Sequence, residues 1–137
     1  MNQAGYSATP LAKKLGIKAG ASVVLIEAPE GYRSWLAGLP DGVCFVGAAP
    51  KGGADVVHLF VVSIADLERR LPAARRAMKV DGALWVSWRK KSAKTDTDVT
   101  EGAIRDRALA TDLVDVKVCA VSDIWSGLKL VVRKALR

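Results

Sequence analysis

The sequence predicts a single three-layer α/β domain over residues 1–137, with about six strands in a mostly parallel sheet and a carboxyl-terminal antiparallel hairpin. Three observations support this fold class. Continuous aliphatic runs, such as VVLI at 23–26, show no polar alternation, which is typical of parallel strands buried on both faces. Segments with helix-start signals separate these runs. The last two apolar stretches are joined by only a few residues, which indicates a hairpin.

The amino-terminal elements follow from local signals. A short helix is predicted over 9–16, because Thr9 can cap it, Pro10 suits its first position and Gly16 suits a left-handed residue at its end. The stretch ASVVLIEA at 21–28 then forms a buried strand, since its aliphatic residues are bounded by glycine and proline.

The next elements complete the first half of the sheet. A second helix is predicted to begin at Pro29 and to end at Gly38, and a short strand follows at 43–47. The stretch DVVHLFVVS at 55–63 is the most apolar and β-branched part of the chain. It is therefore expected to be the central strand.

A helix and a strand follow the central strand. Ser63 with Asp66 three residues later has the form of a capping box, so a helix is predicted there. Pro72 is expected to kink or divide this helix, because proline lacks the amide that the helix needs. A strand is predicted over 83–88.

The end of the chain carries one more helix and the hairpin. Asp98 with Glu101 resembles another capping box and predicts a helix that runs up to the last two strands. These strands are placed at 114–122 and 127–134, with the turn around Trp125.

The net charge of +7 comes from one segment. Residues 67–94 hold nine Lys or Arg and two Asp or Glu, whereas cations and acids balance in the rest of the chain. Such clustering favours an anionic partner, either a nucleotide or a nucleic acid. Read as a solvated helix face and loop, the same cations need no partner.

Several function classes are disfavoured. No apolar run approaches the ~18 residues that cross a bilayer, and the amino terminus lacks signal-peptide features, so a cytoplasmic protein without membrane contact is expected. Cys44 and Cys119 are expected to be buried free thiols, and no metal site is expected. His58 is expected to be a hydrogen-bonded core residue, and no catalytic residue is assigned.

Two stretches carry a family resemblance. LGIKAGASVVLIEAPEG at 15–31 resembles the opening of class I S-adenosylmethionine methyltransferases, where G-x-x-V-L leads through an acidic residue into a glycine-rich turn. LPAARRAMKVDGALWVSW at 71–88 resembles a later helix and strand of that family, and the terminal hairpin resembles its final antiparallel pair. The whole chain also resembles a group of small bacterial proteins classed as a domain of unknown function. These resemblances imply a Rossmann-like fold with methyltransferase topology, reduced by about one strand–helix unit.

The resemblance breaks at the cofactor turn. Aligning Gly20 with the first glycine of the pattern puts Leu25 at the acid, puts Glu27 and Pro29 at the first two turn glycines, and leaves only Gly31 matched. Glycines there let the backbone approach the ligand, which a Glu side chain and a Pro ring obstruct. The second strand also runs into VGAAP, without the acid that family members use to hold the ribose. No cofactor is therefore expected; the alternative is S-adenosylmethionine in a pocket lined by Glu27, Glu30, Gly31 and Ser63.

The candidate binding edge lies where the parallel strands end, because open α/β sheets bind ligands there. The segment WVSWRKKSAK at 85–94 ends at that edge, and tryptophan beside cations suits a nucleotide or single-stranded nucleic acid. The candidate binding residues are Trp88, Arg89, Lys90, Lys91, Lys94, Trp125 and Ser126. In the alternative interpretation, Trp88 caps the core and the cations are solvated.

Three functional hypotheses follow. The leading one is a non-catalytic methyltransferase-like domain that binds an anionic partner at its basic edge. The second is an S-adenosylmethionine-dependent methyltransferase with a remodelled cofactor turn. The third is a protein-interaction module that presents the strand at 43–47 or the turn around Trp125. A monomer or a homodimer is expected.

Overall fold

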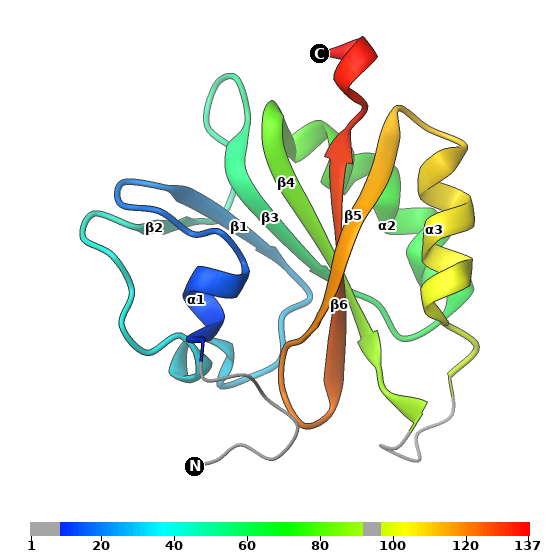
Figure 1. The fold of residues 1–137 in the computed structure, drawn as a ribbon, viewed down its shortest axis with the longest axis horizontal. Helices are drawn as coiled ribbons and strands as arrows, with labels where there is room; N and C mark the ends of the chain where they lie inside the picture. The colour runs from blue at the N-terminus through cyan, green and yellow to red at the C-terminus, as the bar shows by residue number, and fades with distance from the viewer. Residues whose placement is uncertain (1–8, 92–96) are drawn as a thin grey trace.

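In the computed structural model, which describes residues 9–91 and 97–137, the chain forms a six-stranded sheet with helical layers on both faces (Figure 1). The strands are Ser22–Ile26 (β1), Cys44–Val46 (β2), Ala54–Phe60 (β3), Met78–Arg89 (β4), Leu113–Ala120 (β5) and Trp125–Val132 (β6). Their order is β2-β1-β3-β4-β6-β5. The first four pair in parallel, whereas β6 runs antiparallel to both β4 and β5. The predicted fold class is confirmed.

The two helical layers differ in thickness. The helices α2 (Ile64–Ala77) and α3 (Glu101–Leu109) cover one face and bury their apolar residues in the larger hydrophobic cluster. The opposite face carries the short helix α1 (Leu11–Lys14) and the 3-10 turn η1 (Tyr32–Trp35), which contribute to a second cluster. A last 3-10 turn, η3 (Lys134–Leu136), lies near the end of the chain. The face under α1 is therefore covered by much less helix than the face under α2 and α3 (Figure 1).

The central strand serves both layers. Val57 and Leu59 of β3 join the cluster that contains α2, while Val56 and Phe60 join the cluster that contains α1. Successive side chains of a strand point to opposite faces, so a strand covered on both sides needs apolar residues throughout. Because β3 pairs with β1 on one edge and β4 on the other, its predicted central position is confirmed.

The first helix is shorter than predicted. α1 has four residues, and Pro10 rather than Thr9 occupies its N-cap position, with no side-chain capping bond. Gly16 follows with a φ of 75°, so the left-handed residue predicted at the end of this helix is present.

The helix predicted from Pro29 to Gly38 is wrong, because only the single turn η1 forms there. Gly31 has a φ of 85°, which lies outside the right-handed helical region. A helix that began at Pro29 would have to pass through this residue, so the helical path is broken two residues after its predicted start.

The start of α2 agrees with its sequence signal. The Ser63 hydroxyl accepts a hydrogen bond from the Asp66 amide at 3.0 Å, as a capping box requires. Pro72 lies on the exposed side of α2, which continues over 14 residues without being divided. β4 then begins at Met78, earlier than the predicted 83–88, because Met78 already pairs with the first residue of β3.

The predicted start of α3 is wrong in detail. Thr100 is the N-cap, and its hydroxyl accepts a hydrogen bond from the Ala103 amide at 3.1 Å. Asp98 instead accepts a hydrogen bond from the Ile64 amide at 2.8 Å, so it caps α2 across the sheet edge. The capping-box spacing from Asp98 to Glu101 therefore did not identify the N-cap, because Asp98 is engaged by α2 instead.

The hairpin is confirmed, but its turn lies earlier than predicted. Trp125, Ser126 and Gly127 belong to β6, and Ser126 and Gly127 pair with β5, so the connection lies at 121–124. A Cβ at Gly127 would lie 3.1 Å from Cε3 of Trp85. Close packing, rather than a turn, therefore explains this glycine.

The two cysteines are free, as predicted, but they are not both buried. Cys44 is exposed and Cys119 is half-buried. Cys44 begins the edge strand β2, which has a neighbour on one side only, so little of the fold covers it.

Candidate functional site

The carboxyl ends of β1, β3 and β4 define the candidate edge of the sheet. β1 ends at Ile26, β3 at Phe60 and β4 at Arg89. β3 pairs in parallel with both β1 and β4, so the three strands end at the same edge of the sheet. The edge therefore gathers the turn at 27–31, the loop at 61–63 and the end of β4. Several of the predicted candidate residues, among them Glu27, Ser63 and Trp88, lie along this edge, but they differ from one another in burial and in hydrogen-bond partners.

The turn after β1 holds two residues in the left-handed region. Glu27 has a φ of 59° and Gly31 has a φ of 85°. Within residues 9–91 and 97–137, Glu27 alone among the non-glycine residues has a positive φ. An L-residue in this conformation costs roughly 1–2 kcal/mol. The turn therefore keeps a glycine-like backbone at a position where the resemblance expects glycine and the chain has glutamate.

The polar side chains in and near this turn have different surroundings. The Glu27 carboxylate lies 3.7 Å from a guanidinium nitrogen of Arg70 in α2. Glu30 is exposed. The Ser34 hydroxyl donates a hydrogen bond to the Gly31 carbonyl at 2.6 Å, which closes the turn onto η1. The exposed carboxylate of Glu30 is thus the acidic group of the turn that no helix residue holds.

Ser63 has a capping role at this edge. Its hydroxyl binds the Asp66 amide, and the neighbouring Ile64 amide is bound by Asp98. The Thr97 hydroxyl donates to the Val62 carbonyl at 3.0 Å, so the segment before α3 lies across the start of α2. These amides and the Ser63 hydroxyl are therefore already engaged within the fold.

The two tryptophans of the predicted binding surface are buried. Trp88 is 8% exposed and belongs to the cluster under α2 and α3, while Trp125 is 6% exposed and belongs to the opposite cluster. The prediction of an exposed stacking surface is therefore wrong for both rings. The reason is strand alternation: each ring follows the apolar face of its strand into the core.

The polar residues of that predicted surface remain at the strand ends. The Arg89 guanidinium lies 5.3 Å from the centroid of the Trp125 ring. The Lys90 amide donates to the Ile124 carbonyl at 2.7 Å, and Lys91 is exposed. Ser126 is half-buried and pairs with Trp88 in the ladder between β4 and β6. Lys94 lies outside the described residues.

Within the described part of the basic segment, residues 67–91, the cations do not form one surface. Arg70 pairs with Asp66 at 2.7 Å near the carboxyl edge, whereas Lys79 pairs with Asp55 at 2.7 Å at the start of β3. α2 carries the chain from one edge to the other, and β4 brings it back. Acidic partners also hold two further arginines, Arg69 and Arg75.

Sequence reasoning missed a buried polar chain beneath α1. Nδ1 of His58 lies 2.8 Å from the Tyr32 hydroxyl, and Nε2 lies 2.7 Å from the Ser87 hydroxyl. All three are buried. Burial lowers the pKa of His58 to about 3 and raises the pKa of Tyr32 above its usual value. The prediction that His58 is a hydrogen-bonded core residue is confirmed, but its partners, 26 and 29 residues away, had no sequence signal.

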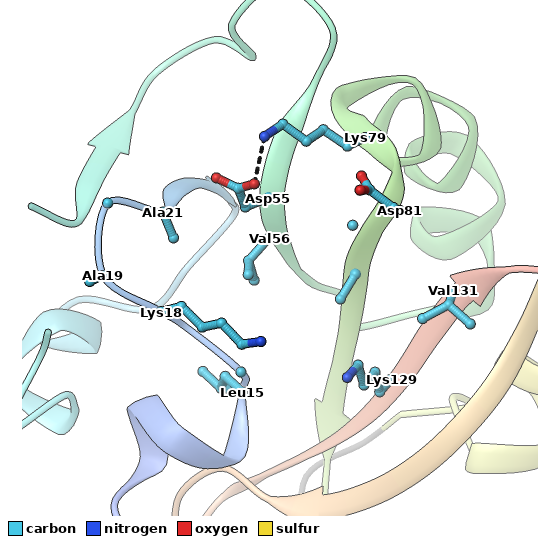
Figure 2. Close-up of a pocket in the computed structure, with 14 residues that line it drawn as sticks. Leu15, Lys18, Ala19, Ala21, Asp55, Val56, Lys79, Asp81, Lys129 and Val131 are labelled. Carbon is cyan, nitrogen blue, oxygen red and sulfur yellow. Dashed lines mark hydrogen bonds and ion pairs between the residues drawn. The ribbon is translucent and has the colours of Figure 1, made fainter. Parts of the chain in front are cut away.

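A cavity of about 610 Å³ lies at the opposite, amino edge of the parallel strands (Figure 2). The segment between α1 and β1 forms one wall, and the starts of β3 and β4 with the end of β6 form the others. Sequence reasoning did not indicate this cavity, because its lining comes from four distant segments.

The described part of the chain contains neither a cluster of potential metal ligands nor a membrane-spanning helix. In residues 9–91 and 97–137, no group of three or more His, Cys, Asp or Glu side chains could hold a metal ion. No helix in the same part of the chain combines the length and apolar character that crossing a membrane requires.

Solved structures identify the class of fold. A SAM-dependent methyltransferase from Aquifex aeolicus matches with a TM-score of 0.56 and 13% identity, over 88% of this chain and 86% of that chain. A complex named DhpI-SAH matches with a TM-score of 0.57 and 14% identity, over 90% of this chain and 82% of that chain. No protein-family model and no curated protein matches this sequence. The chain therefore has a methyltransferase-like α/β fold, and identities this low establish the fold alone.

Proposed function

We propose that this domain binds S-adenosylmethionine, or its product S-adenosylhomocysteine, at the carboxyl edge of the sheet through the turn at 27–31. The proposal rests on the positive φ angles of Glu27 and Gly31, which lie at the first and last positions of the glycine pattern that the turn resembles. The turn follows β1, where open α/β sheets bind nucleotides. The methyltransferase-like fold and the neighbour solved with SAH support the same ligand.

The end of β1 has features that suit this ligand, whereas the end of β2 lacks the carboxylate that would hold its ribose. At β1, Glu27 and Gly31 both have the left-handed φ that glycine favours, and Ser34 Oγ, at 3.7 Å, lies near the position of a Cβ at Gly31. At β2 the chain continues from Val46 into Gly47 and Ala48, so no carboxylate stands there to hold a ribose. We assign that role to Glu30, because it is exposed while Glu27 pairs with Arg70.

Calorimetric titration with S-adenosylhomocysteine tests this proposal. The wild-type chain is expected to bind, and Gly31→Ala is expected to weaken binding at least about ten-fold, because a Cβ strains the left-handed turn. Gly52→Ala is the matched control, since Gly52 has a φ of 88° and open space around it but lies outside the turn. Glu30→Gln is expected to weaken binding without changing stability.

A flat titration of the wild-type chain at millimolar ligand would contradict the proposal. Equal losses in Gly31→Ala and Gly52→Ala would also contradict it, because the effect would then be a general loss of stability.

A second candidate function rests on Arg89. Its Nε is buried and has no hydrogen-bond partner in the described parts of the chain. A buried donor without an acceptor is costly, so it favours an anionic ligand. We propose that Arg89, together with Lys90 and Lys91, binds a phosphate of a nucleotide or short nucleic acid without catalysis.

Fluorescence anisotropy with a labelled short RNA at low salt tests this second function. The double variant Lys90→Glu with Lys91→Glu is expected to abolish binding, and added salt is expected to weaken wild-type binding steeply. The charge-matched control replaces Lys13 and Lys134, which are exposed elsewhere, with glutamate. Similar losses in both double variants would show a non-specific charge effect and contradict the assignment to β4.

A further inference from the structure

The cavity at the amino edge has the size of a small-molecule site (Figure 2). Its volume of about 610 Å³ lies in the range of ordinary ligand pockets, roughly 300–1,000 Å³. It lies at the opposite ends of the parallel strands from the turn at 27–31. Its occupant is therefore independent of the function proposed above.

Two of the cavity's charges are already matched. The Lys79 ammonium lies 2.7 Å from the Asp55 carboxylate, which also accepts the Ser22 amide at 2.8 Å. The hydrogen bond from Lys79 and, to a smaller extent, the one from the Ser22 amide lower the pKa of Asp55. Asp55 and Lys79 thus form an internal ion pair on one wall, and Asp81 lies close to it (Figure 2).

Two lysines on the other walls have no such partner. In the described parts of the chain, no carboxylate forms an ion pair with Lys18 or Lys129. Both side chains extend into the cavity (Figure 2). Burial, followed by repulsion from Lys117 and Lys18, lowers the pKa of Lys129. The cavity therefore holds a half-buried ammonium beside like charges, an arrangement that an anion would relieve.

The uncharged residues of the lining are apolar or glycine. Leu15, Val56 and Ala83 are buried, and Val131 is half-buried. Nε1 of Trp85 donates to the Leu15 carbonyl at 3.0 Å, and Trp85 pairs with Lys129 across the strands. A ligand held by the lysines would therefore place its remaining atoms beside Val131 and the aliphatic stems of the two lysines.

We propose that this cavity binds a small molecule with one carboxylate and an apolar body, with the carboxylate held between the ammonium groups of Lys18 and Lys129. The five charged side chains of the lining, three lysines and two aspartates, carry a net charge of +1, which matches a single negative charge. The apolar body lies on the Val131 side, away from the pair of Asp55 and Lys79.

Calorimetric titration with octanoate as the probe tests this site. A parallel titration with inorganic phosphate, an anion without an apolar body, tests whether the apolar body contributes to the affinity. Octanoate is expected to bind the wild-type chain, and Lys18→Met and Lys129→Met are each expected to weaken it at least about ten-fold. Methionine keeps an apolar stem of similar length and removes the charge. Lys13→Met is the matched control, because Lys13 is exposed on α1 and does not line the cavity.

A second readout separates binding from packing. Without ligand, Lys129→Met is expected to raise the thermal midpoint, because it removes a half-buried charge near Lys18 and Lys117, and Lys13→Met is expected to leave it unchanged. The octanoate-induced rise of the midpoint should then be lost in Lys129→Met and in Lys18→Met, and kept in Lys13→Met.

Three outcomes would overturn the proposal. The first is no octanoate binding at millimolar concentration. The second is an unchanged octanoate affinity in Lys129→Met. The third is phosphate binding as tightly as octanoate through the same lysines, because the apolar body would then contribute nothing. None of these outcomes depends on S-adenosylhomocysteine binding at the other edge.

Discussion

The Tyr32 hydroxyl lies 2.8 Å from Nδ1 of His58, and both groups are buried between the sheet and η1. Nε2 of the same ring contacts the Ser87 hydroxyl at 2.7 Å. A neutral imidazole has one donor and one acceptor nitrogen, and each hydroxyl can adopt the complementary role. The chain of three groups therefore satisfies the buried imidazole and ties η1 to β3 and β4.

The buried His58 predicts a distinct dependence of stability on pH. Its pKa is lowered from 6.5 to about 3, so between these values the unfolded chain binds a proton that the folded chain does not. The free energy of unfolding should therefore fall as the pH falls through this window, by up to about 1.4 kcal/mol per pH unit. Urea unfolding at pH 7, 6 and 5, on protein without a histidine tag, measures it.

His58→Gln is the control for this pH dependence. The chain has one histidine, and its carboxylates stay mostly ionised above about pH 5, so the slope between pH 6.5 and 5 isolates His58. The variant is expected to be less stable at pH 7 but nearly flat over this range. A flat wild-type curve would show that the ring is charged in the folded state.

The conformation of Glu27 predicts a stabilising substitution. Glu27→Gly should raise the free energy of unfolding by about 0.5–1 kcal/mol, because glycine adopts a φ of 59° without strain. The lost pair with Arg70 is exposed and offsets this gain only slightly. Glu30→Gly is the comparison: Glu30 has no positive φ, so glycine there should destabilise by a few tenths of a kcal/mol to about 1 kcal/mol. Denaturant unfolding of both variants decides whether the Glu27 backbone is strained.

Two adjacent glycines should respond differently to alanine. A Cβ at Gly53 would lie 2.6 Å from the Lys79 amide nitrogen and from the Met78 carbonyl carbon, and its φ is 101°. Gly53→Ala must therefore push β3 and β4 apart and should cost more than about 3 kcal/mol. Gly52→Ala meets open space at a φ of 88° and should cost about 1 kcal/mol. Equal thermal midpoints for the two variants would contradict the close approach of the two strands.

The Arg75 and Asp112 pair joins the end of α2 to the residue before β5. Nε and Nη2 of Arg75 both bind the carboxylate, with distances of 2.9 and 3.1 Å from Nε and 2.9 Å from Nη2. This contact lowers the pKa of Asp112, so its contribution is present above the usual aspartate range and lost as the pH falls below it. Asp112→Asn should cost about 1 kcal/mol at pH 7, and progressively less as the pH falls below the usual aspartate range. Asp106→Asn, at an exposed position of α3, should have no effect at either pH.

Local sequence patterns were sufficient for the order and type of most elements. The apolar run at 23–26 in β1 and the mostly apolar residues of β3 indicate strands buried on both faces, and the structure places both inside the sheet. Ser63 and Asp66 lie within one turn of each other, so their capping contact could be predicted from spacing alone. The helix predicted at Pro29 failed because the φ of Gly31 depends on how the turn packs, which no local pattern specifies.

The candidate sites depended on contacts that are distant in sequence. The sequence by itself determined a three-layer α/β domain, a central apolar strand and a net charge of +7, because these follow from composition and short-range periodicity. Tertiary structure alone decided that Trp88 and Trp125 are buried, that the cations of 67–91 separate to two edges, and that Lys18 and Lys129 line one cavity. Parallel crossovers return the chain to the same edge only after a helix, so neighbours in the sequence are carried apart and distant residues meet.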